Sequence, residues 1–246
     1  STHHGTNMPI FQHDQVNIHY EIHGDGFPVL LFAPGGMLSA ASFWANAEWD
    51  PIRTLSPHFK VIAMDQRNAG ASTAPVSRND GWHSYADDHL ALLDHLNVDQ
   101  THVLGGCIGG PYCFGVIKAH RERVAAAVLQ QSIGCDDNRD LFYAMFDHWA
   151  DAIKDQHPEA DDDDWHAFRS NMYDGEFLYN VDRDFVTACT VPMLVLMGSD
   201  PYHPETISRE LADLVPNATL IEEWKNPEQD GTVASVISFL QAATPA

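Results

Sequence analysis

The sequence predicts an α/β fold in which helices flank a mostly parallel, twisted sheet. Two observations support this prediction. Short, continuously apolar segments recur along the chain, which is typical of strands buried on both faces of a parallel sheet. Segments with the apolar spacing of a helix alternate with them, as βαβ units require. A length of 246 residues suits one such domain better than two equal ones.

The composition excludes several kinds of partner. Hydrophobic residues make up 44% of the chain, enough for a sizeable core. The 35 acidic residues outnumber the 13 Lys and Arg, and the formal net charge of −22 argues against nucleic acid or an anionic membrane surface as a partner. The four cysteines show no paired or zinc-like spacing, and no apolar run approaches membrane-spanning length. With no signal-peptide pattern either, we expect a cytoplasmic protein without metal or cofactor.

The elements follow from apolar periodicity and from turn residues. A segment with alternating polar and apolar residues, 16–22, is a half-exposed strand that pairs with 9–11, and the apolar segments after it are buried strands. The helix at 84–96 carries His89 and His95, which we expect at its surface. The predicted strands are 9–11, 16–22, 29–33, 60–65, 102–104, 124–129, 191–197 and 218–223. The predicted helices lie within 40–55 and at 84–96, 111–120, 141–154, 165–172, 205–214 and 230–242.

The pattern Gly105-x-Cys107-x-Gly109 organises the rest of the chain. A strand ends at a cysteine between glycines and a helix begins at once, so the small neighbours allow strand and helix to pass closely. The dipole of that helix favours the thiolate form of Cys107. The alternative is a buried cysteine before an ordinary helix, with glycines that serve only packing.

Three further motifs each follow an apolar strand. Pro34-Gly35-Gly36 offers flexible backbone N–H groups, or is a plain Pro-Gly turn. Asp65 and Arg67 are interpreted as a buried pair that pins a loop, in which Asn68 tolerates a positive φ. The last apolar strand but one ends in Gly198-Ser199-Asp200.

The joint occurrence of these motifs, in this order, resembles the α/β-hydrolase superfamily from residue 29 to residue 240. In the superfamily the sharp turn between strand and helix, called the nucleophile elbow, usually carries a serine. In this chain the elbow carries Cys107 instead. The resemblance implies that Cys107 is the nucleophile and Asp200 the acid of a triad. It also implies that the backbone N–H groups of Gly36 and Ile108 form the oxyanion hole.

Between 134 and 190 the alternation of strands and helices breaks, and two aromatic helices are joined by an acidic run, Asp161 to Asp164. The run lacks the spacing of a calcium loop and is interpreted as a solvated loop or a helix start. The insertion resembles the helical cap of many α/β hydrolases. We therefore expect a core at 8–133 and 191–246, a cap at 134–190 and a flexible leader at 1–7. The expected pocket residues are Gly35, Met37, Phe142, Phe146, Trp149 and Trp165.

The expected triad lacks its histidine. In the superfamily that histidine follows the last strand, but the loop 224–229 contains none, and the last histidine in the chain is His203. His203, three residues after Asp200, is then the base, unless it only caps the following helix. Alternatively the thiol needs no strong base to deprotonate it, since free cysteine is already a few per cent thiolate at neutral pH. A third alternative is that hydrolysis has been lost.

The resulting functional hypothesis is a hydrolase that cleaves a small ester, thioester or lactone through an acyl-enzyme on Cys107. One alternative is a lyase or carbon–carbon-bond enzyme on the same fold, and another is an inactive ligand-binding protein. In each case the partner is a small molecule. Homodimer formation is left open.

Overall fold

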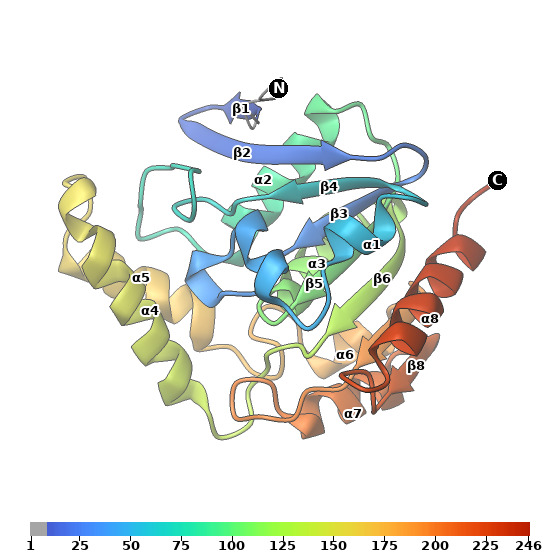
Figure 1. The fold of residues 1–246 in the computed structure, drawn as a ribbon. Helices are drawn as coiled ribbons and strands as arrows, with labels where there is room; N and C mark the ends of the chain where they lie inside the picture. Colours follow the sequence, from blue (N-terminus) through green and yellow to red (C-terminus); the bar gives the residue numbers. More distant parts are fainter. Residues whose placement is uncertain (1–8) are drawn as a thin grey trace.

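One eight-stranded sheet forms the centre of the molecule (Figure 1). The computed structural model describes residues 9–246, so the predicted leader at 1–7 lies outside the described residues. The strand order is β1-β2-β4-β3-β5-β6-β7-β8. The strands are β1 (Ile10–His13), β2 (Val16–His23), β3 (Pro28–Phe32), β4 (Lys60–Met64), β5 (Thr101–Gly106), β6 (Val124–Gln130), β7 (Met193–Leu196) and β8 (Ala218–Ile221).

The sheet is mostly parallel, as the sequence predicts. Strands β1 and β2 form an antiparallel hairpin and β2 pairs antiparallel with β4, whereas every pair from β4 to β8 is parallel. Along β3, Leu30 and Phe32 join the core on one face while Val29 and Leu31 join the core on the other. A strand buried on both faces must be apolar at every position, which explains the continuous runs in the sequence.

Helices cover both faces of the sheet (Figure 1). Helices α2 and α3 pack on one face, and α1 and α8 on the other. The helix predicted within 40–55 is a 3-10 helix at Ala41–Asn46 followed by the short α1, which Asp50 caps and Pro51 begins. The helices are α1 (Pro51–Leu55), α2 (Trp82–His95), α3 (Gly109–Ala119), α4 (Arg139–Ile153), α5 (Asp162–Tyr173), α6 (Arg183–Thr187), α7 (Glu205–Leu214) and α8 (Gln229–Ala242).

Helices α4, α5 and α6, here called the inserted helices, follow β6 and precede β7. Because β6 and β7 pair directly, the insertion leaves the sheet intact. Helices α4 and α5 lie beyond the ends toward which the arrows of β3, β4 and β6 point (Figure 1). The acidic run is a helix start, in which Asp161 and Asp164 each accept the other's backbone N–H. The division into a core and a cap at 134–190 stays a prediction.

The expectation that His89 lies at the surface is wrong. Helix α2 begins at Trp82 and turns Tyr85, His89 and Leu92 inward together, so the imidazole is fully buried. Burial, and then the charge of Arg67, lowers the pKa of His89 to about 3. The ring is therefore neutral, and its Nε2 lies 2.7 Å from the side-chain oxygen of Gln66.

Asp65 and Arg67 both pin loops, but they do not pair with each other. The Asp65 carboxylate accepts the backbone N–H groups of Ala41 and Ala71. The Arg67 guanidinium donates two hydrogen bonds of 2.7 Å to the buried carboxylate of Asp88. Asn68, which follows Arg67, has a φ of 57°. This agrees with the expectation that asparagine tolerates a positive φ at this position.

Two absences apply to the part of the chain that the structure describes. No helix within 9–246 combines the length and apolar character needed to cross a membrane. In the same range, no three His, Cys, Asp or Glu side chains are grouped so that they could hold a metal ion.

Strand β5 and helix α3 approach each other too closely for a side chain between them. A Cβ added at Gly105 would lie 2.1 Å from the carbonyl oxygen of Gly109, and one at Gly109 would lie 2.5 Å from the carbonyl oxygen of Phe32. Neither backbone oxygen can move without displacing its whole element. The glycines therefore hold strand and helix at the spacing that the intervening turn needs.

We expect Gly105→Ala to lower the free energy of unfolding by roughly 2–4 kcal/mol, because the methyl group must push α3 off the sheet. Urea unfolding followed by circular dichroism measures this change. Gly231→Ala is the matched control, since an added Cβ at this position in the first turn of α8 meets nothing within 4 Å. That control should be neutral or stabilise by up to about 1 kcal/mol. Similar effects of the two substitutions would contradict the steric explanation.

Candidate active site

Cys107 occupies the sharp turn between β5 and α3. Its φ is 58°, in the left-handed region that non-glycine residues rarely adopt. Two backbone hydrogen bonds hold it there, from Cys107 N–H to the Gln130 carbonyl (3.0 Å) and from Ile133 N–H to the Cys107 carbonyl (3.2 Å). The residue is half-buried. The turn thus presents the sulfur at the carboxyl edge of the sheet, where active sites of α/β folds form.

Asp200 and His203 lie in a single reverse turn after β7. Pro201 occupies the second position, and the N–H of His203 donates to the carbonyl of Asp200 (3.0 Å). The Asp200 side chain accepts the N–H groups of Tyr202 and His203, and its Oδ2 lies 2.8 Å from Nδ1 of His203. The turn therefore fixes the imidazole against the carboxylate.

The turn is held from two sides. A Cβ at Gly198 would lie 2.3 Å from the His203 carbonyl oxygen, so only glycine permits the turn to close, and the Gly198 N–H donates to the buried Ser208 hydroxyl (2.9 Å). From the inserted segment, the buried Asn138 amide donates to the Pro201 carbonyl (2.9 Å). Neither Ser208 nor Asn138 carries a signal in the sequence, because each acts through a partner far along the chain or on another element.

The structure brings His203 to Cys107. With Nδ1 bound to Asp200, the other ring nitrogen, Nε2, is buried and finds no hydrogen bond of regular geometry within residues 9–246. Burial lowers the pKa of His203, but hydrogen bonding and charge from Cys107, and then from Asp200, outweigh it and raise the pKa to about 9. His203 is therefore charged at neutral pH, beside the sulfur.

The charge of His203 acts in turn on Asp200. Burial raises the pKa of the Asp200 carboxyl, but the hydrogen bond and charge of His203 and two backbone N–H groups outweigh this and lower it. Asp200 thus stays ionised and keeps the imidazole in one orientation and tautomer.

The loops that carry Gly36 and Ile108 lie next to each other. They follow β3 and β5, which pair in parallel and so end at the same edge. A Cβ on Gly106 would lie 3.4 Å from Pro34, which shows how closely the loops meet. In the described chain neither the Gly36 nor the Ile108 N–H donates a hydrogen bond to the protein. Two free amide donors at this edge match the requirement for holding an oxyanion.

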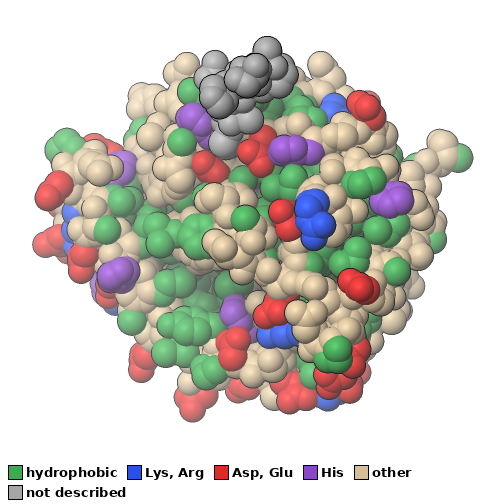
Figure 2. Space-filling model, viewed as in Figure 1, with side chains coloured by type: hydrophobic (Ala, Val, Ile, Leu, Met, Phe, Trp, Pro, Cys, Tyr) green, Lys and Arg blue, Asp and Glu red, His purple; other side chains and the backbone are tan. Residues whose placement is uncertain are grey.

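A cavity of about 350 Å³ lies between the loop after β3, helix α4 and the turn of His203. Figure 2 shows a hollow between the inserted helices and the sheet, with hydrophobic side chains around it and histidine and acidic side chains at its border. Leu38 and Tyr202, at its edge, are among the exposed large hydrophobic residues. The cavity is lined by Gly35, Met37, Leu38, Ala144, Met145, His148, Trp149 and Tyr202.

The predicted pocket residues separate into two groups. Gly35, Met37 and Trp149 line the cavity. Phe142, Phe146 and Trp165 are almost fully buried and pack against other aromatic rings. Their rings pack α4 against α5, a contact that helical periodicity alone cannot distinguish from a pocket wall.

The loop after β8 serves the opposite face of the sheet. Trp224 is buried there, and its indole N–H donates to the Met197 carbonyl (2.8 Å). Trp224 at the start of this loop is thus part of the core, while the histidine beside Cys107 comes from the preceding loop, after β7.

Sequence comparisons agree on the family. A family model described as alpha/beta hydrolase fold matches residues 28–159. A protein from Agrobacterium fabrum with the provisional name carbamate hydrolase RutD is 33% identical over 94 residues, which are 38% of this chain and 35% of that protein. A protein of the same name from Caulobacter sp. is 23% identical over 240 residues, 84% of this chain and 87% of that protein. The alignments with the first two relatives thus span less than half of their lengths.

Solved structures agree on the fold. The meta-cleavage product hydrolase of Pseudomonas fluorescens IP01 superposes with a TM-score of 0.69 at 20% identity and covers 93% of this chain and 96% of that one. The enol-lactonase of Burkholderia xenovorans LB400 gives a TM-score of 0.71 at 22% identity, with 95% and 100% covered. With more than half of its length matched by the family model, and with this sheet order, the chain belongs to the α/β-hydrolase family.

Proposed function

We propose that this chain hydrolyses a small ester, thioester or lactone through an acyl-enzyme on Cys107. The alignment of Asp200, His203 and Cys107 carries the proposal. One imidazole nitrogen is bound to the carboxylate, and the other has no partner of regular geometry, while the ring interacts with Cys107. This is the order of groups that activates a nucleophile for acyl transfer. A lyase without an acyl-enzyme, or a ligand-binding protein, needs no such base beside the thiol.

The groups account for each step. The Cys107 thiolate attacks the carbonyl carbon, and the electron pair of the C=O bond moves to oxygen, where the Gly36 and Ile108 N–H groups stabilise it. The pair returns, the bond to the leaving group breaks, and His203 gives that group its proton. Neutral His203 then takes a proton from water, whose oxygen attacks the thioester. Collapse releases the acid and restores the Cys107 thiolate beside protonated His203.

The cavity favours a neutral, mostly apolar substrate. Among the described residues that line it there is no Lys or Arg, and the chain carries a formal net charge of −22. A carboxylate on the part of the substrate away from His203 would therefore find no Lys or Arg to pair with. Helix α4 supplies Ala144, Met145 and Trp149 to the wall. On this basis residues 134–190 act as the cap over the site.

The names of similar proteins support hydrolysis of a carbonyl compound. They include carbamate hydrolase, 2-hydroxymuconate semialdehyde hydrolase and enol-lactonase. They do not agree on one substrate. The thiol, its base and the two free amides are what favour this class of bond.

Cys107→Ala is expected to lower kcat/KM for p-nitrophenyl acetate at least about a thousandfold, because it removes the group that forms the covalent bond. Intact-mass analysis during turnover should show an acetyl adduct on the wild type and none on the variant. Cys135→Ala is the control, since that thiol is also half-buried but lies beside Arg139. An unchanged rate in Cys107→Ala would remove the basis of the proposal.

The rate of hydrolysis should decline as pH rises through about 9. Because the pKa of His203 is raised, its proton is present below that pH and lost above it, and with it the donor for the leaving group. Asp200→Asn removes a negative charge that holds this proton, so the decline should begin at lower pH. A pH profile of kcat/KM from 6 to 10.5, using an ester with an unactivated alcohol, measures the decline in the wild type and its shift in Asp200→Asn. A profile that is the same in wild type and His203→Asn would exclude His203 as the donor.

A further inference from the structure

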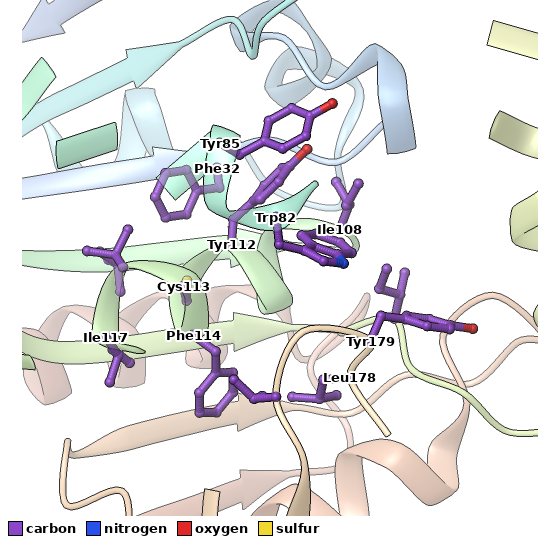
Figure 3. Close-up of a cluster of buried hydrophobic side chains, with 14 of the residues drawn as sticks. Phe32, Trp82, Tyr85, Ile108, Tyr112, Cys113, Phe114, Ile117, Leu178 and Tyr179 are labelled. Atoms are coloured by element: carbon purple, nitrogen blue, oxygen red, sulfur yellow. The ribbon is translucent and has the colours of Figure 1, made fainter. Parts of the chain in front are cut away.

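Three buried tyrosines meet beneath the elbow. Tyr85, Tyr112 and Tyr173 come from α2, α3 and α5, and each is at most 2% exposed. The rings of Tyr85 and Tyr112 lie 5.1 Å apart, and Trp82 packs edge-on against both Tyr112 and Tyr173. Figure 3 shows Tyr85 and Tyr112 side by side, with their hydroxyls on the same side and Ile108 close by.

The hydroxyls of this cluster lack strong protein partners. Within residues 9–246 the Tyr85 and Tyr112 hydroxyls have no partner except each other, and that of Tyr173 reaches only the sulfur of Met37, at 3.4 Å. Burying an unpaired hydroxyl costs free energy, and phenylalanine would fill the same space without that cost. Core packing therefore explains the three rings but not their hydroxyls.

The hydroxyls lie beside the proposed oxyanion loops. Met37, which the Tyr173 hydroxyl contacts, follows Gly36, and Tyr112 stands five residues after Cys107 on the elbow helix. Burial raises the pKa of both Tyr112 and Tyr173, and the nearby charge of Cys107 adds to the rise. Both phenols thus remain protonated donors, within electrostatic reach of the sulfur.

We propose that Tyr112 and Tyr173, with Tyr85 behind them, bind an uncharged oxygen on the acyl part of the substrate. This inference rests on the proposed function and narrows its substrate class to acyl groups with an ether, keto or hydroxyl oxygen near the scissile carbonyl. A carboxylate fits less well. Arg67, whose charge acts on Tyr85, already donates two hydrogen bonds to Asp88, and the surroundings are apolar.

Two esters that differ by one atom test the inference. p-Nitrophenyl methoxyacetate places an ether oxygen where p-nitrophenyl butyrate has a methylene, and comparing the ratio of their kcat/KM values between variants cancels the difference in intrinsic reactivity. We expect Tyr112→Phe to lower this ratio about tenfold, with the value for butyrate unchanged within twofold. Tyr173→Phe should act in the same direction. Tyr20→Phe, a tyrosine buried on β2, is the control and should leave the ratio unchanged.

The outcomes separate the inference from the proposed function. If Tyr112→Phe and Tyr173→Phe leave the ratio unchanged while Cys107→Ala abolishes turnover, the tyrosine inference is overturned and the hydrolase proposal stands. If the wild type turns over neither ester, the hydrolase proposal fails. In that case the inference is decided by the affinities of two unreactive ketones for the Cys107→Ala protein, measured by NMR titration. Tighter binding of methoxyacetone than of 2-pentanone, lost in the Tyr112→Phe background, supports it, and equal binding overturns it.

Discussion

The near-contact between β5 and α3 is the constraint on which the site depends. With Gly105 facing the Gly109 carbonyl at a distance that excludes a Cβ, the chain can reverse only through a left-handed residue, and that residue is Cys107. Its side chain is thereby directed to the edge of the sheet at which strands β3 and β7 also end and their following loops begin. Backbone sterics thus select the position of the sulfur before any polar contact forms.

The second determinant is electrostatic and local. Asp200 and His203 form their hydrogen bond inside one turn, so no other loop has to be positioned for the pair to exist. The neighbouring sulfur and carboxylate outweigh the effect of burial and keep the imidazole protonated. Ser208 and Asn138 then fix the turn as a unit against α7 and the inserted segment. With the base supplied by the loop after β7, the loop at 224–229 needs no histidine and contains none.

Short-range features were predictable from the sequence, and long-range pairings were not. The glycine spacing around Cys107 determines the strand–helix turn locally. The four residues from Asp200 to His203 likewise determine their own reverse turn. Arg67 pairs with Asp88 rather than Asp65, and His89 faces inward, because partners from other elements decide both. Tyr112 lies within the predicted helix 111–120, where helical periodicity gives it no special role. Its significance lies in a hydroxyl without a strong partner, which only three-dimensional packing reveals.

Placing the proposed acid, Asp200, and the proposed base, His203, in one four-residue turn has a further consequence. In enzymes that take the two groups from separate loops, evolution can adjust one without disturbing the other. Here any backbone change that shifts one of them shifts both, so the pair is inherited or lost together. Under the proposed mechanism the segment after β8 carries no catalytic group, so its sequence is constrained by folding alone.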